Sequence, residues 1–175
     1  MTAHRGDELV PDANMIFDRR RDIPAPPAAI WPWIVQLGKH RAGWYAPRSV
    51  ERLLPPARRA TRSIRPDFQD LAVGDRIPDY GGAGAHLQVA VIEPPRVLIY
   101  RDRRRGAPFS WAITLTPLVD GGETRVDLRF RGRIRSIGLL RRVILGGGEL
   151  FDGLTAEIML RGLAERAVTM SPRPR

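Results

Sequence analysis

The chain carries few side chains whose types and spacing suit catalysis or metal binding. Its three histidines, His4, His40 and His86, are scattered, and none forms a pair at the helical or hairpin spacing of metal ligands. There is no cysteine, which excludes disulfides and thiolate metal sites. No nucleophile elbow, no His-Asp-Ser set and no close pair of carboxylates emerges. We therefore expect no metal and no other cofactor, and no catalytic residue can be assigned.

Two glycine-rich stretches lack the context of a phosphate-binding loop. Residues 81–84 (GGAG) do not lie between a strand and a helix in a GxGxxG pattern, and they lack the lysine of a P-loop. They are better explained as a flexible loop at the entrance of a cavity. Residues 146–148 precede a helix start, where an anion could bind, but a hinge or terminator role is favoured.

Five polar residues have positions that suit the orientation of a ligand. Asp152 falls on the inward stripe of a terminal helix, although an acid in a first helical turn is also favoured by the macrodipole alone. His86 and Gln88 share one face of a strand, and they face a ligand only if that face is the inner one; both alternatives stay open. Tyr80 and Tyr100 would place hydroxyl groups in or near a pocket.

A second set of candidates is apolar and follows from strand and helix periodicity. Trp111 shares a strand face with apolar neighbours on both sides, and two aromatic residues form a tight corner after Gly43. For each residue alone, core packing is the commoner role. The apolar candidates for ligand binding are Trp44, Tyr45, Phe109, Trp111, Met159 and Leu163.

The element that organises these candidates is an amphipathic helix predicted over residues 148–168. Its apolar stripe contains Met159 and Leu163, whereas Glu157, Arg161 and Glu165 follow one another at i, i+4 spacing on the solvated face.

The elements before this helix are predicted to be a strand, two short helices and an antiparallel meander. The strand over 124–135 alternates most clearly, with Val126, Leu128 and Phe130 on one face and charged residues on the other. The expected strands are residues 15–23, 76–78, 87–93, 97–102, 109–117 and 124–135. The expected short helices are residues 28–37 and 49–54, and a loop without regular structure follows over 55–66. Pro32 is expected to bend the first helix. Gln36, near the end of the first helix, is either a ligand contact or a solvated residue.

Several segments resemble an uncharacterised bacterial branch of the SRPBCC superfamily, the START-related and polyketide-cyclase-like proteins. The resemblance lies in IPAPPAAIWPWIVQLG (23–38), GWY (43–45), FQDLAVGD (68–75), SWA (110–112) and MLRG (159–162). It implies an α+β helix-grip fold, in which a curved antiparallel sheet of about six to seven strands wraps around a long C-terminal helix. It also implies a cavity between sheet and helix.

Three functions remain open at this stage. The first is binding, transport or sequestration of a hydrophobic or amphipathic small molecule, lipid or polyketide-like. The alternatives are an enzyme of the cyclase, aromatase or dehydratase type, and an interaction module that uses a basic surface.

Composition narrows the setting in which the protein acts. The formal net charge is +10, and 28 of the 29 basic residues are arginine, as GC-rich coding produces, so we predict no specific nucleic-acid partner and only weak attraction to anionic surfaces. No apolar run long enough to span a membrane occurs, and the N-terminus lacks a signal-peptide core. We expect a cytoplasmic protein with one domain over 15–168, a disordered tail over 1–14 and a second tail over 169–175.

Overall fold

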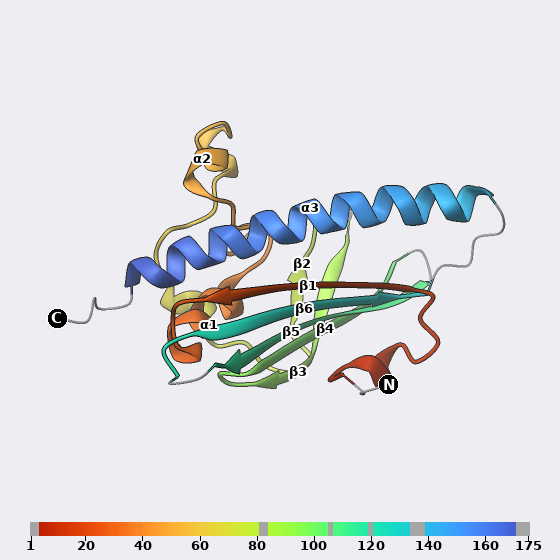
Figure 1. Cartoon of the computed structure of the whole chain (residues 1–175), viewed down its shortest axis with the longest axis horizontal. Helices are drawn as coiled ribbons and strands as arrows, with labels where there is room; N and C mark the ends of the chain where they lie inside the picture. The colour runs from red at the N-terminus through yellow and green to blue at the C-terminus, as the bar shows by residue number, and fades with distance from the viewer. Residues whose placement is uncertain (1–3, 81–83, 105–106, 119–120, 134–138, 171–175) are drawn as a thin grey trace.

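The computed structural model describes residues 4–80, 84–104, 107–118, 121–133 and 139–170. For Arg104, residues 139–153 and Met170 it defines the course of the backbone. The predicted fold class is confirmed: the chain is α+β, with one open, curved antiparallel sheet and a long C-terminal helix lying along one of its faces (Figure 1). This is a helix-grip fold.

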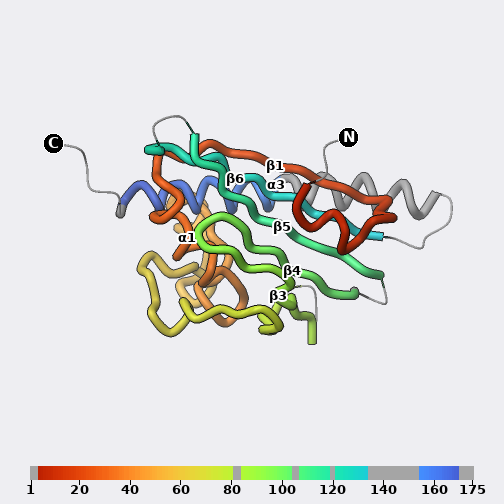
Figure 2. Tube along the Cα trace, turned by 90° about the horizontal axis from the view of Figure 1, so that it is seen from below, coloured from red at the N-terminus to blue at the C-terminus, as the bar shows by residue number. Residues whose placement is uncertain are grey.

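The sheet has six strands in the order β1-β6-β5-β4-β3-β2. Every neighbouring pair is antiparallel, so the strands form a meander after β1 has taken the edge beside β6 (Figure 2). The strands are β1 (Met15–Ile23), β2 (Arg76–Pro78), β3 (His86–Glu93), β4 (Val97–Arg104), β5 (Ala107–Pro117) and β6 (Thr124–Gly132).

Alternation along the strands decides which face of the sheet is covered. In β6, Val126 and Leu128 are buried on the inner face, the face towards the helix. The neighbouring Asp127 and Arg129 lie on the outer face, where they pair with arginine and aspartate from β1 and the N-terminal segment. The same parity in β5 buries Ile113 on the inner face.

The helical elements lie between β1 and β2 and at the end of the chain. They are η1 (Asp7–Leu9), α1 (Pro27–Gln36), α2 (Arg48–Glu51), η2 (Pro56–Arg58), η3 (Pro66–Phe68) and α3 (Leu139–Met170). Proline occupies the first position of α1, where a missing N–H is harmless, and Pro32 lies within the helix. The helix α3 packs on β1 and α1.

The predicted start of the terminal helix is wrong. The helix begins at Leu139, not at residue 148, and runs through the three glycines at 146–148 that we interpreted as a hinge or terminator. Glycine costs a helix about 1 kcal/mol per residue relative to alanine, and the leucine- and arginine-rich stretch before the glycines favours the helix. Once a helix has formed on both sides, propagation across three residues is easier than a new nucleation.

Other boundaries differ by smaller amounts. Strand β6 ends at Gly132, before the predicted end at 135, and β4 ends at Arg104 and β5 begins at Ala107, two residues beyond the predicted limits at 102 and 109. The segment over 55–66, expected without regular structure, contains η2 and buries Ala60 against Gly43.

The N-terminal segment follows a fixed course over residues 4–14. Asp7 receives hydrogen bonds from Arg129, and Arg131 donates to the carbonyl oxygen of Val10 at 3.0 Å. Leu9 packs on Ile99 beneath it, in a small apolar cluster on the outer face of the sheet. We expected a tail here; the limits of the domain at 15 and 168 stay a prediction.

Candidate functional site

A row of aromatic side chains crosses the inner face of the sheet. Phe17 of β1 stacks on Phe130 of β6, with ring centroids 6.1 Å apart, and Phe109 of β5 stacks on the same ring at 5.5 Å. Trp111 continues the row on β5 and stacks on Tyr100 of β4 at 5.7 Å. The register explains the row, because Trp111 lies opposite both Phe130 and Tyr100 in neighbouring strands.

Trp44 extends this row from outside the sheet. Its ring stacks on Trp111 at 5.7 Å with the planes 28° apart, and its Nε1–H donates to the carbonyl oxygen of Thr155 in α3 at 3.4 Å. The corner that places it needs Gly43, whose φ of +87° lies in the left-handed region. A side chain at Gly43 would also press on Ala60 at 3.1 Å. The predicted aromatic corner therefore connects sheet and terminal helix.

The row is only partly covered by the rest of the protein. Phe17, Trp44, Trp111 and Phe130 are half-buried, although residues on the same face of neighbouring strands are fully buried. Large aromatic surface left open on an inner face is typical of a ligand-binding surface, since a finished core would bury it.

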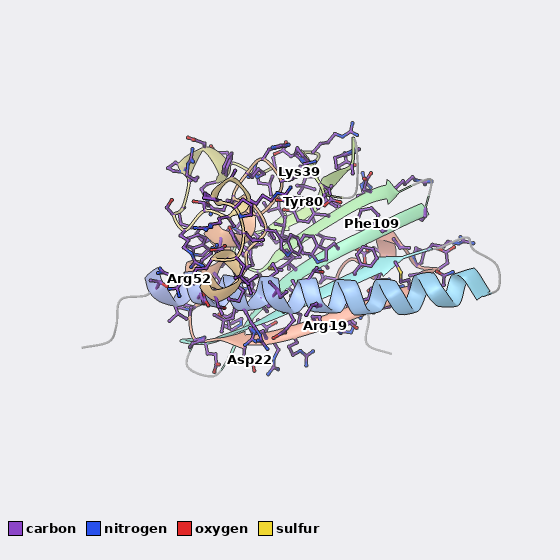
Figure 3. The ribbon with its side chains drawn as sticks, turned by 90° about the horizontal axis from the view of Figure 1, so that it is seen from above. Arg19, Asp22, Lys39, Arg52, Tyr80 and Phe109 are labelled. Atoms are coloured by element: carbon purple, nitrogen blue, oxygen red, sulfur yellow. The ribbon has the colours of Figure 1, made fainter. Side chains whose placement is uncertain are left out.

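A pocket opens at the Trp44 end of this row. Its volume is about 260 Å³ when the part open to solvent is counted. Most of the lining is apolar, and the polar groups lie at its rim, where Figure 3 shows Lys39 and Tyr80 at the side of the molecule away from α3. The lining residues are Leu37, Gly38, Lys39, Trp44, Pro78, Asp79, Tyr80, Leu87, Tyr100 and Trp111.

Tyr100 supplies the most deeply placed polar group of this pocket. The residue is only 1% exposed, and within the described part of the chain its hydroxyl makes no hydrogen bond. Burial raises the pKa of Tyr100 well above its usual range, and the nearby charge of Arg41 opposes this only in part. The hydroxyl is therefore neutral across the physiological range and has a hydrogen bond left to give.

Four predicted site residues thus line one pocket: Trp44, Tyr80, Tyr100 and Trp111. Four others are buried around it as core. Phe109 lies in the aromatic row, and Met159 and Leu163 lie on the inward stripe of α3, at 1% exposure each. Tyr45 is fully buried; its hydroxyl donates to the carbonyl oxygen of Trp33 at 2.8 Å and accepts from Gln36.

Of the remaining three predicted residues, two are not brought to the pocket. Gln88 pairs across from Arg101, on the face opposite to that of Tyr100, and accepts a hydrogen bond from its guanidinium at 3.2 Å. His86 contacts Arg76 and lies 3.6 Å from Asp102 at the end of β3. The inner-face alternative for His86 and Gln88 is therefore not realised. The side chain of Asp152 lies outside the described residues.

Two buried polar residues of this region have roles that the sequence analysis missed, and for Gln36 neither predicted alternative, ligand contact or solvated residue, is realised. Gln36 is fully buried; its Oε1 accepts from the backbone N–H of Arg65 at 2.9 Å, and its Nε2 donates to the carbonyl oxygen of Ser63. Arg166 of α3 is 2% exposed, donates to Glu51 at 2.6 Å and lies 4.5 Å over the ring of Tyr45. The only available signal was the position of Gln36 in an otherwise apolar helix.

The described residues also bear on metals and membranes. They contain no group of three His, Asp or Glu side chains that could hold a metal ion. None of the helices in the described ranges combines the length and apolar character that crossing a membrane requires.

Comparison with known proteins places the fold among solved structures. No family model matches the chain, and no curated protein matches it. Protein MLL2253 from Mesorhizobium loti is 19% identical, with a TM-score of 0.52 over 90% of this chain and 99% of that one. Protein jhp0584 from Helicobacter pylori is 11% identical, with a TM-score of 0.58 over 95% and 97%. DynU16, from the dynemicin biosynthetic locus, is 15% identical, with a TM-score of 0.53 over 91% of this chain and 49% of its own length. At these identities the likeness is one of fold.

Proposed function

We propose that this protein binds a hydrophobic or amphipathic small molecule at the aromatic row, and that it is a member of the SRPBCC superfamily. The observation that carries the proposal is the stacked, half-buried set Trp44, Trp111 and Phe130 on the inner face of the sheet. Flat aromatic surface of this kind recognises the flat or apolar part of a ligand. The superfamily assignment is supported by the helix-grip fold and by the motifs over 23–38 and 43–45.

The pocket also favours a ligand with a polar end. Tyr100 offers a buried O–H donor, and Lys39 and Asp79 add charges of both signs to the lining. A carbonyl group would accept from Tyr100. The pocket itself is shallow: most of its volume of about 260 Å³ is open to solvent, and the enclosed part, about 10 Å³, is far below the roughly 300–1,000 Å³ typical of drug-sized ligands. We therefore infer that the pocket takes up only the polar end of a ligand whose apolar part lies along the aromatic row.

The test is to identify a bound molecule and then to alter the pocket. Native mass spectrometry of the protein purified from its own cells should show a mass shift that disappears after denaturation. Calorimetric titration with that molecule should give a Kd that rises about tenfold in Trp44→Leu, because a stacking surface is lost. Tyr100→Phe should raise the Kd about three- to tenfold, because one hydrogen bond is lost.

Gln88→Leu, on the outer face, is the matched control and should bind as the parent does. The proposal fails if no small molecule co-purifies, or if Trp44→Leu and Tyr100→Phe bind the molecule as tightly as the parent.

A further inference from the structure

The segment around α2, residues 48–59, forms a lobe that projects from the fold. In Figure 1 it stands on the side of α3 that faces away from the sheet. Leu53 lies in this lobe and is 85% exposed, more than any other large hydrophobic side chain of the described residues. At this exposure, Leu53 gains little from burial within the described part of the chain and has apolar surface available to a partner.

Much of the net charge gathers around this leucine. Residues 48–66 contain six arginines and one glutamate, a net charge of +5 out of +10 for the whole chain. Arg62 pairs with Glu51, and Arg65 pairs with Asp67. Within the described residues, the four arginines of the lobe make no ion pair: Arg48, Arg52, Arg58 and Arg59.

On the outer face of the sheet, the arginines of β1 and β6 follow a different pattern. There Arg20 pairs with Asp127, Arg125 pairs with Asp22, and Arg129 pairs with both Asp7 and Asp18. The charges along β1 and β6 are therefore compensated, and those of the lobe are not. Within the described residues, the lobe is the place where uncompensated arginines surround a fully exposed leucine.

The lobe is held in place from beneath. Glu51, at the end of α2, is buried and accepts from Arg166 of α3 at 2.6 Å. Arg59 donates to the carbonyl oxygen of Leu54 at 2.9 Å, which closes the segment on itself, and Pro55 and Pro56 restrict its backbone. The exposed leucine is thus presented on an anchored support.

We propose that the lobe docks the protein on anionic membrane surfaces, with Leu53 entering the headgroup region and Arg52, Arg58 and Arg59 contacting lipid phosphates. A membrane surface can take up an apolar side chain among its lipids and bind arginine side chains at its phosphates. Nucleic acid would accept only the cations, and residues 48–66 contain no aromatic side chain that could stack on bases. The proposal does not depend on the ligand pocket.

Vesicle co-sedimentation of the full chain tests this docking. Binding to vesicles of phosphatidylcholine with about one third phosphatidylserine should exceed binding to phosphatidylcholine alone by at least about tenfold, and it should fall as salt rises. Leu53→Ser removes apolar surface without changing charge and should lower the partition coefficient about tenfold. Arg52→Gln with Arg58→Gln should also lower it about tenfold or more.

Matched variants away from the lobe serve as controls. Val73→Ser removes another exposed apolar side chain, and Arg96→Gln with Arg103→Gln removes two exposed charges elsewhere. Both should bind vesicles as the parent does, and circular dichroism should show all four variants folded.

Equal effects of the lobe and control variants would overturn the proposal, as would unchanged vesicle binding by Leu53→Ser. If the protein instead binds duplex DNA more tightly than vesicles, in a salt-sensitive way that Leu53→Ser leaves unchanged, the lobe is a nucleic-acid-binding surface. Vesicle binding is read without any pocket ligand, so its failure is distinguishable from failure of the proposed function.

Discussion

Arg166 carries a positive charge that is almost fully buried, at 2% exposure. Its guanidinium is buried in α3, where it donates to Glu51, to the carbonyl oxygens of Ala46 and Gly162, and to that of Thr61. Buried charges are tolerated only where every donor is satisfied, and these four acceptors come from the corner, the lobe, the segment after the lobe and α3 itself. Arg166 therefore joins the lobe and the corner at Ala46 to the terminal helix.

Replacing Arg166 by methionine should lower the free energy of unfolding by about 1–3 kcal/mol, because the buried Oε1 of Glu51 loses its donor while Arg62 still holds Oε2. Urea denaturation followed by circular dichroism measures the change. The double variant Arg166→Met/Glu51→Leu should recover part of the loss, since both charges are then gone. A double variant as unstable as the sum of the single variants would contradict this account.

At the scale of single residues, the direction of a side chain could be predicted where it follows the local periodicity of a strand or helix. The inward positions of Trp111, Met159 and Leu163 follow from strand alternation and helical spacing. The pairing of Glu51 with Arg166 spans 115 positions of the chain and has no local signature. Whether Gln88 points inward or outward could not be predicted for a related reason. Alternation separates the residues of a strand into two faces, and only the pairing with the neighbouring strand shows which face is the inner one.

Between elements, the closest approach is that of α3 to the corner before α2. A Cβ atom added to Gly162 would lie 2.6 Å from the backbone nitrogen of Ala46 and 2.7 Å from its Cα. No real Cβ atom comes so near to backbone, so any side chain at this position must push the corner away from the helix.

Gly162→Ala should therefore destabilise the protein, although alanine is the better helix former by about 1 kcal/mol. Overpacking against backbone costs about 1–3 kcal/mol, so we expect a lower Tm in thermal unfolding. Leu154→Ala, at an exposed position of the same helix, is the control and should leave Tm nearly unchanged. A raised Tm for Gly162→Ala would show that the corner does not contact the helix this closely.

At the scale of elements, the order, type and pairing pattern of the strands were predictable, because tight turns separate short alternating runs. The start of α3 was not, because three consecutive glycines read as a break, and what overrides them is propagation from both sides. The course of residues 4–14 was also hidden. Its anchors are Arg129 and Arg131, which in the sequence are ordinary members of a solvated face.

Taken whole, the molecule places a compensated charge layer on the outer face of its sheet. Burial alone would raise the pKa of Asp7, but hydrogen bonds from Arg129 and the charges of Arg129 and Arg131 outweigh it and lower this pKa below its usual value. The pKa of Glu157 on α3 is lowered in the same way: burial opposes the change, and Arg161 and Arg21 impose it.

These lowered pKa values predict that stability falls in acid. A carboxylate whose pKa is lower in the folded chain stabilises the fold fully above its unfolded pKa of about 4, and this contribution is lost as the pH falls through the folded pKa. The urea midpoint should therefore decrease between about pH 5 and pH 2.

Asp7→Asn should lower the midpoint at pH 7 and should converge on the parent near pH 2, where Asp7 of the parent is protonated as well. Asp70→Asn, at an exposed position that makes no ion pair in the described part of the chain, should keep the parent profile. A parallel offset of Asp7→Asn at every pH would contradict the assignment.

The stacked pair Trp44 and Trp111 has an optical consequence. Two indole rings with centroids 5.7 Å apart and planes 28° from parallel share their electronic excitation, and the phenol of Tyr100 lies at the same distance on the other side of Trp111. Chromophores coupled in this way absorb left and right circularly polarised light unequally. The circular-dichroism spectrum then shows a pair of bands of opposite sign. Because one of these rings comes from the sheet and the other from the corner fixed to α3, the sign and size of those bands record the spacing between them. Circular dichroism can therefore report the distance between the corner and the sheet without an added label.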